Sequence, residues 1–139
     1  MEVCQYSRKK HGQELWSWWM QRDDEDYDCL DLLPMVDQDN GHGRGVSDET
    51  GPIVAVFAMM TVGVGIAWFE RFVSRPGLHY KKTREAGALA YGWLEAYVKE
   101  LDYHLSYAHL GDVRMGRELS RLGFVEMGRN MLLMAKNLD

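Results

Sequence analysis

The sequence predicts a single domain over residues 1–139 with an α/β (α+β) fold, in which helices flank a mixed central β-sheet. Two observations support this. A charge-free run, Ile53–Phe69, is rich in Val and Ile and is interrupted by glycines, and the residues after it alternate between helical and strand patterns. At 139 residues the chain is long enough to bury one core and too short for two.

The first half of the chain predicts a strand and a helix before a variable region. Residues 1–6 alternate weakly, which favours an edge strand, and a helix is expected over Lys9–Arg22. The apolar side chains that recur at helical spacing, and that we expect in the core, are Leu15, Trp16, Trp19 and Met20.

The variable region has three parts. The acidic run Asp23–Asp31 is expected to be a solvated connection, and residues 32–36 a short strand. The polar, Gly-rich segment Asp37–Pro52 is expected to be a loop of the kind that often borders a site.

The run Ile53–Phe69 predicts two buried strands joined by a tight turn. Thr61, Gly63 and Gly65 lie near its middle, and the second strand is expected to continue to Ser74. A membrane helix is the alternative, because 17 residues without charge is the short limit for a span.

Alternation along the second strand predicts which side chains share a face. Trp68, Glu70 and Phe72 are expected on one side, and Phe69, Arg71 and Val73 on the other.

The second half predicts helix, strand, helix and strand. A helix is expected over Lys82–Leu101, a strand over Tyr103–Leu110, a helix from Asp112 to a stop at Gly123, and a strand or strand pair over 125–136. The expected buried side chains of the first helix are Ala86, Leu89, Ala90, Trp93, Leu94, Tyr97, Val98 and Leu101.

Composition excludes several function classes. The net charge of -5 argues against a general nucleic-acid binder, which needs a basic excess. Cys4 and Cys29 have no partner at metal-ligand spacing, so neither a metal site nor a disulfide framework is indicated. The N-terminus carries no apolar segment of a secretory signal, and a cytoplasmic location is expected.

Two stretches carry a resemblance to a known family. They are "SRPGLHYKKTREAGALAYGWL", Ser74–Leu94, and "ELSRLGFVEMGRNMLL", Glu118–Leu133. With the order of elements, they resemble the GNAT acetyltransferase superfamily. The resemblance covers Ile53–Lys136, and the first fifty residues match only in the order of elements. It implies a GNAT-like fold that uses acetyl-CoA.

In that family, backbone N–H groups at a helix N-terminus hold a pyrophosphate, in a pattern of Arg or Gln, two residues, Gly, one residue, and Gly or Ala. Two registers remain open here. Arg84 with Gly87 places Leu89 at the small position, whereas Lys81 with Ala86 places Arg84 at the Gly position. Without the family, the same residues indicate a helix that starts after a Pro-Gly turn.

The resemblance implies a set of cofactor-binding residues. The pyrophosphate loop would comprise Lys81, Lys82, Thr83, Arg84, Glu85, Ala86 and Gly87. The backbone of Phe72, Val73 and Ser74 would bind the pantetheine arm, and Asp112 takes the place of a frequent Asn of the family.

The resemblance also assigns the catalytic candidates. Leu119 stands where the family often has a Tyr that protonates the departing thiolate, and Leu cannot donate a proton. Tyr107 and His109 are the candidate substitutes, with ordinary strand residues as the alternative. Glu70 is the candidate base, since burial beside aromatic side chains is expected to raise its pKa; a salt bridge to Arg75 is its alternative role.

The leading hypothesis is therefore an acetyl-CoA-dependent N-acetyltransferase, monomeric or homodimeric, that acts on an amine of a small molecule or a protein. The alternative is a catalytically weakened GNAT-like protein that binds another protein, because the family Tyr is missing, the pyrophosphate pattern is degenerate, and many Trp and Met residues are available for a contact surface. Small divergent domains of this kind resemble those encoded by bacteriophages, in which case the protein would bind and modulate a host enzyme.

Overall fold

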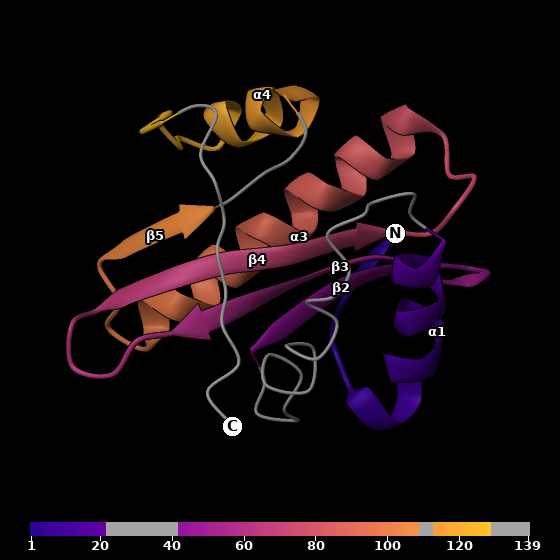
Figure 1. The fold of residues 1–139 in the computed structure, drawn as a ribbon, viewed down its shortest axis with the longest axis horizontal. Coiled ribbons are helices and arrows are strands. Elements are labelled where there is room, and N and C mark those ends of the chain that lie inside the picture. Colours follow the sequence, from indigo (N-terminus) through magenta and orange to yellow (C-terminus); the bar gives the residue numbers. More distant parts are fainter. Residues whose placement is uncertain (22–41, 109–112, 129–139) are drawn as a thin grey trace.

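The computed structural model describes residues 1–21, 42–108 and 113–128 (Figure 1). The elements in chain order are β1 (Glu2–Gln5), α1 (Arg8–Met20), β2 (Gly43–Asp48), β3 (Gly51–Met60), β4 (Ile66–Ser74), α3 (Tyr80–Glu100), β5 (Leu105–Ala108) and α4 (Val113–Arg121).

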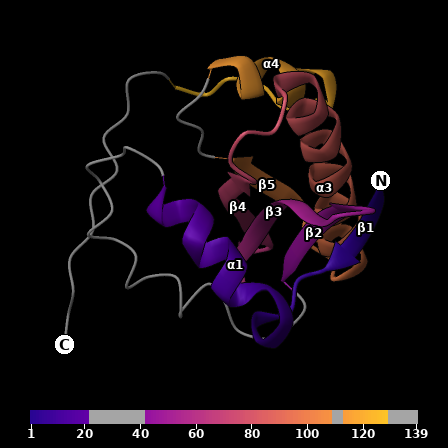
Figure 2. The same ribbon diagram turned by 90° about the vertical axis from the view of Figure 1, so that its right-hand side faces the viewer.

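The strands form one five-stranded sheet in the order β1-β2-β3-β4-β5. Strands β1 to β4 pair antiparallel with their neighbours, and β5 pairs parallel with β4, so the sheet is mixed. Helices α1 and α3 cover opposite faces of it (Figure 2). The predicted fold class is confirmed.

The predicted hairpin is confirmed. Strands β3 and β4 take up the charge-free run, and Gly63 and Gly65 adopt positive φ values of 82° and 65° in the turn between them. Glycine accepts this backbone region without a steric penalty, which is why the run breaks there. The membrane-helix alternative is wrong, and no helix of the described ranges has the length and apolarity to cross a membrane.

The expected loop over Asp37–Pro52 contains a strand, β2, and this part of the prediction is wrong. The sequence of β2 has a poor strand propensity, but the strand lies between β1 and β3. Its backbone therefore forms hydrogen bonds with a neighbouring strand on each side. A Cβ at Gly43 would lie 2.7 Å from the Cβ of Tyr6, so the glycine permits close packing there. The turn to β3 is tight, and Asp48 pairs with Gly51 across it.

The sheet separates two clusters of buried side chains. Leu15 and Trp18 of α1 pack on one face, with Tyr6, Ala55, Phe57 and Val73. Helices α3 and α4 pack on the other face, where the core includes Val54, Val56, Phe69, Ala90, Tyr91, Leu94, Met115 and Leu119. We call these faces of the sheet the α1 face and the α3 face.

The core side of α1 differs from the prediction. Leu15 is buried as expected and Trp18 is buried as well, whereas Trp16 and Met20 are exposed. The side chain of Trp19 lies outside the description. Four apolar residues at Leu15, Trp16, Trp18 and Met20 surround much of the helix, so hydrophobicity alone could not orient it.

The buried side of α3 is also rotated from the prediction. Its buried residues are Ala86, Gly87, Ala90, Tyr91, Leu94 and Val98. Leu89, Trp93 and Leu101 are exposed instead of buried. Small residues on the inner side let the helix approach the sheet closely, which places the larger Leu and Trp side chains outside.

The predicted end of the last helix is confirmed. The amide of Phe124 donates to the carbonyl of Leu119 at 3.0 Å, and the amide of Gly123 donates to Ser120 at 3.1 Å. With Gly123 at φ 95°, this is a Schellman motif.

Some predicted elements fall wholly or partly outside the description. The acidic run, the strand at 32–36 and the cap at Asp112 lie outside the described residues. So does most of the strand expected over 125–136, and its described residues 125–128 form no strand.

Candidate functional site

A cavity of about 140 Å³ lies where the end of β4, the start of α3 and the middle of α4 meet. Its lining residues are Phe72, Ser74, Tyr80, Thr83, Arg84, Met115 and Glu118. Three hydroxyl-bearing side chains, one cation and one carboxylate therefore surround a partly apolar space.

The charged residues of the cavity form a cluster around Glu118. Its side chain is only 11% exposed and accepts hydrogen bonds from Nη1 of Arg121 at 2.8 and 3.0 Å. Nε of Arg84 lies 3.4 Å from the same carboxylate. One buried negative charge thus faces two cations, which leaves the cluster with a net positive charge.

The backbone at the start of α3 is arranged around His79. Gly77 turns the chain with a φ of 77°, and His79 is the N-cap of the helix. Its Nδ1 accepts from the amide of Lys81 at 3.2 Å, and its carbonyl accepts from the amide of Thr83 at 3.1 Å. The imidazole therefore already bonds one amide of the first turn, where an anion would otherwise bind.

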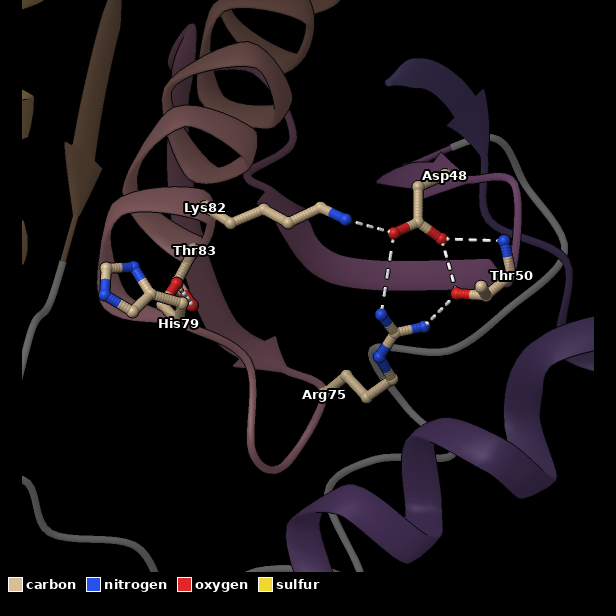
Figure 3. A network of polar contacts seen from close by, with 6 residues as sticks. All are labelled: Asp48, Thr50, Arg75, His79, Lys82 and Thr83. Carbon is tan, nitrogen blue, oxygen red and sulfur yellow. Dashed lines mark hydrogen bonds and ion pairs between the residues drawn. The ribbon is translucent and has the colours of Figure 1, made fainter.

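Asp48 connects the β2–β3 turn to β4 and α3 (Figure 3). Its carboxylate accepts from Lys82 and from the amide and hydroxyl of Thr50, at 2.9 and 2.6 Å for the latter two. Nη2 of Arg75 lies 3.5 Å away, and Nη1 of Arg75 donates to Thr50 Oγ1 at 2.7 Å.

These bonds lower the pKa of the Asp48 carboxyl well below its ordinary value, with the bond from Lys82 as the largest cause and those from Thr50 next. The network also engages Arg75, which was the predicted alternative partner of Glu70.

The structure places the candidate pyrophosphate residues in the first two turns of α3. Lys81 and Glu85 are exposed, Lys82 is held by Asp48, and Arg84 lines the cavity. Gly87 lies deeper, where an added Cβ would be 3.1 Å from Cε of Met115 and 3.3 Å from the Phe72 ring.

The three candidate pantetheine residues divide between the faces of the sheet. Phe72 and Ser74 line the cavity, and Val73 is buried in the α1 cluster. Asp112 lies outside the described residues.

A bulge in β4 changes the predicted alternation. Ala55 pairs with Val73 and Phe57 with Glu70, so β4 advances three residues while β3 advances two. Phe72 therefore lies on the α3 face with Phe69, and both rings contact Tyr91. The prediction that grouped Phe72 with Glu70 is wrong for this reason, and the side chain of Arg71 is outside the description.

Glu70 and Tyr107 lie on the same face of neighbouring strands. Glu70 is opposite Phe57, a member of the α1 cluster. Tyr107 pairs with Trp68, and their rings stack at 4.7 Å. Both catalytic candidates therefore lie on the α1 face, while His109 is outside the described residues.

The described pairing of β4 with β5 covers Ile66 to Phe69, because the residues directly after Ala108 lie outside the description. The last pair is Phe69 with Ala108, and β4 continues to Ser74. Figure 1 shows β5 beside the first part of β4. Glu70 directly follows the last described pair.

The charge of Glu70 also affects the pKa of Tyr91, a buried residue of α3. Burial raises the pKa of the Tyr91 hydroxyl, and the negative charge of Glu70 raises it further. Tyr91 is 1% exposed and remains neutral at working pH.

The sequence analysis missed four residues of this region. Glu118 and Arg121 stand three apart on one helix, a spacing that could have indicated their ion pair. His79 directly precedes the helix, at the capping position. Asp48 had no local signal, because its partner Lys82 is 34 residues away.

Comparisons with known proteins agree on the fold. No family model and no curated protein sequence matches the chain. Solved structures of acetyltransferases do match. The aminoglycoside 6'-N-acetyltransferase AAC(6')-IG from Acinetobacter haemolyticus superposes with a TM-score of 0.63 at 12% identity, over 100% of both chains.

Two further structures extend the comparison. AAC(6')-Iy, in complex with the bisubstrate analogue CoA-S-monomethyl-acetylneamine, has a TM-score of 0.65 at 13% identity over 98% of each chain. Glucosamine-6-phosphate N-acetyltransferase from Arabidopsis thaliana has a TM-score of 0.59 at 12% identity, over 99% of this chain and 98% of that one. The chain therefore has the fold of GNAT acetyltransferases.

Proposed function

We propose that the protein is an N-acetyltransferase that uses acetyl-CoA and transfers the acetyl group to a primary amine. The observation that carries the proposal is the cavity of about 140 Å³ at the start of α3, lined by Arg84 and by hydroxyl groups, in a chain with the fold of GNAT acetyltransferases. The candidate base Glu70 lies on the α1 face, while Phe72 and the cavity lie on the α3 face. The thioester of a bound acetyl-CoA would have to reach from the cavity to the α1 face to meet Glu70.

The residues of the cavity fit the phosphate end of coenzyme A. Arg84 supplies a cation, and Ser74, Tyr80 and Thr83 supply hydroxyl groups. The volume of about 140 Å³ suits one part of the cofactor and not the whole. Within the described residues, Arg84 has only Glu118 as an acidic partner, and Arg121 already balances that carboxylate.

The side chains of the α1 face would carry the proton transfers. Bound acetyl-CoA supplies the activated acetyl group. Glu70 would accept the proton that the amine loses as the new C–N bond forms and the C–S bond breaks. Tyr107 would donate a proton to the leaving sulfur, which yields an amide and a free thiol.

Calorimetric titration of the purified protein with acetyl-CoA tests the proposal. We expect saturable binding, accompanied by thermal stabilisation of about 2.7 kcal/mol at a concentration one hundred times the Kd. Absence of heat and of stabilisation at millimolar acetyl-CoA would contradict it.

A second function, binding of another protein without acetyl transfer, is favoured by two other observations. Leu119 is 3% exposed in the α3 cluster, so this position faces the core and donates no proton. Leu89 and Trp93 of α3 are 40% and 57% exposed, and they offer an apolar surface for another protein. If the protein works by binding, a pull-down should recover one stoichiometric partner, and Trp93→Ala should abolish this capture whereas Glu70→Gln should not. If the protein is an enzyme, Glu70→Gln should stop acetyl transfer and Trp93→Ala should not.

A further inference from the structure

Helix α3 carries apolar residues on the side opposite its buried residues. Leu89 is 40% exposed and Trp93 57% exposed, and the two are neighbours on the helix surface because they are four residues apart. A Cβ added at Gly92 would meet no atom within 4 Å, and Ala96 is exposed. We call Ala88, Leu89, Gly92, Trp93 and Ala96 the outer face of α3.

Small residues form the centre of the outer face. Ala88, Gly92 and Ala96 recur every four residues, so they lie in one line along the helix. Short side chains at a contact let a second helix approach closely. Leu89 and Trp93 each directly follow a residue of this line, so both large side chains lie on the same flank of it. The outer face therefore has the shape of a surface that packs against another helix.

The exposed charges of α3 and of the turn after it identify the helix that fits this face. Lys81 and Glu85 precede the outer face, and Lys99 and Asp102 follow it. Glu85 and Lys99 each lie seven residues from Gly92, and Lys81 and Asp102 lie eleven and ten residues from it. A second α3 that crosses antiparallel at Gly92 thus places opposite charges together, whereas a parallel α3 places each charge against its own copy.

The charged groups at the far end of α3 are accessible to such a helix. The side chain of Lys99 is 69% exposed and that of Asp102 92% exposed. Lys99 already contacts Glu95 of its own helix at 2.8 Å. An ammonium group has three donors, so Lys99 can also bind a carboxylate from a second chain.

We propose that the outer face of α3 is the interface of a homodimer, in which the α3 helices of two copies of this chain pack antiparallel around a two-fold axis at Gly92. The occupant is a second copy because the order of charges is complementary to itself, as a two-fold interface requires. The inference goes beyond the proposed function and does not depend on acetyl transfer.

The two-fold axis also brings the large apolar side chains together. It places Leu89 and Trp93 of both protomers on the same side of the helix crossing. With a rise of about 1.5 Å per residue, Trp93 of one protomer lies within about 3 Å, measured along the helices, of the position of Leu89 in the other. The exposed apolar surface of each protomer is then buried against that of its partner.

Sedimentation equilibrium of the purified chain tests the proposal over concentrations of about 1 to 500 µM. One helix pair is a small interface, so we expect a monomer–dimer equilibrium with a micromolar Kd. Trp93→Ala should raise this Kd about tenfold or more, because it removes the largest side chain of the contact. Trp16→Ala is the matched control, since Trp16 is a 42% exposed Trp on α1, and it should leave the Kd unchanged.

Charge reversal tests the antiparallel orientation. Glu85→Lys alone and Lys99→Glu alone each place like charges opposite one another twice, so each should raise the Kd about tenfold. The double variant restores opposite charges and should return the Kd to within about threefold of wild type, whereas a parallel pair would gain nothing from it. Glu49→Lys makes the same change at an exposed site outside α3 and is the control. All these side chains are exposed, so the variants should fold, as thermal unfolding verifies.

Three results would overturn the proposal. The first is a chain that stays monomeric at every concentration, even if Trp93 is needed to bind a different protein. The second is a dimer that Trp93→Ala leaves intact, because its interface then lies elsewhere. The third is a dimer that the double charge reversal does not restore. A failure to bind acetyl-CoA would contradict only the proposed function, so the two proposals fail separately.

Discussion

Nε of Arg84 lies 3.4 Å from Oε1 of Glu118, a buried carboxylate that Arg121 holds from its own helix. This contact joins the first turns of α3 to α4 across the cavity. It places the cation of the cavity against a carboxylate that already has a partner, so Arg84 can also interact with an anionic ligand.

Arg84→Ala should weaken acetyl-CoA binding by about ten- to thirtyfold, the loss expected for one charged hydrogen bond. Calorimetric titration measures the change. Arg117→Ala is the control, because Arg117 is an exposed arginine of α4 that lies outside the cavity lining. Equal affinities of the Arg84→Ala variant and wild type would exclude Arg84 from the cofactor site.

Asp48→Asn should change how stability depends on pH. The pKa of Asp48 is lowered in the folded protein, so the folded state releases this proton more readily than the unfolded chain. The stability from this group is present above the ordinary Asp pKa of about 4 and is lost as pH falls below it, toward the folded-state pKa.

Thermal unfolding at pH 7, 5, 4 and 3 measures this effect. The Tm of the wild type should exceed that of Asp48→Asn at pH 7, and the gap should narrow between about pH 5 and 3. Glu49→Gln, an exposed acid in the same turn, is the control and should follow the wild type. Parallel curves for wild type and Asp48→Asn would contradict the linkage.

Two glycines of α3 should respond differently to substitution by alanine. Gly92 has no atom within 4 Å of an added Cβ, so Gly92→Ala should raise the free energy of unfolding by about 0.5 to 1 kcal/mol through helix propensity. Gly87→Ala gains the same propensity, but its Cβ meets Phe72 and Met115 at 3.3 and 3.1 Å.

We therefore expect Gly87→Ala to gain less than Gly92→Ala or to lose stability, as measured by urea unfolding. Gly87→Val should lose about 1 to 3 kcal/mol, because a larger side chain overpacks the contact between α3, β4 and α4. A Gly87→Ala variant as stabilised as Gly92→Ala would show that this contact is looser than the structure describes.

Glu70→Gln should lower kcat by about 10²- to 10⁴-fold, the usual contribution of a general base. The Kd of acetyl-CoA should stay within twofold, because Glu70 lies on the α1 face and the cavity on the α3 face. Single-turnover acetylation of a primary amine that the wild-type protein accepts measures the chemical rate, and calorimetry measures the Kd of acetyl-CoA. An unchanged kcat would remove Glu70 from the proton transfer.

The bulge in β4 marks where sequence patterns stopped predicting the site. Strict alternation placed Phe72 with Glu70, whereas the additional residue between Glu70 and Val73 moved Phe72 to the cavity side. A bulge depends on the register between two strands, and no pattern within one strand encodes it. The prediction of the buried side of α3 was wrong for a related reason. Close packing against the sheet buries Gly87 and Tyr91 and leaves Leu89 and Trp93 exposed.

The sequence alone determined the local features: the hairpin around Gly63 and Gly65, the helix stop at Gly123, and the order of strands and helices that predicts a mixed sheet. These depend on backbone preferences and hydrophobic periods of neighbouring residues. Only the tertiary structure decided that β2 is a strand, that Asp48 holds Lys82, and that Trp68 stacks on Tyr107 beside Glu70. Each of these requires contacts between residues far apart in the chain, whose pairing is set by the packing of the whole sheet.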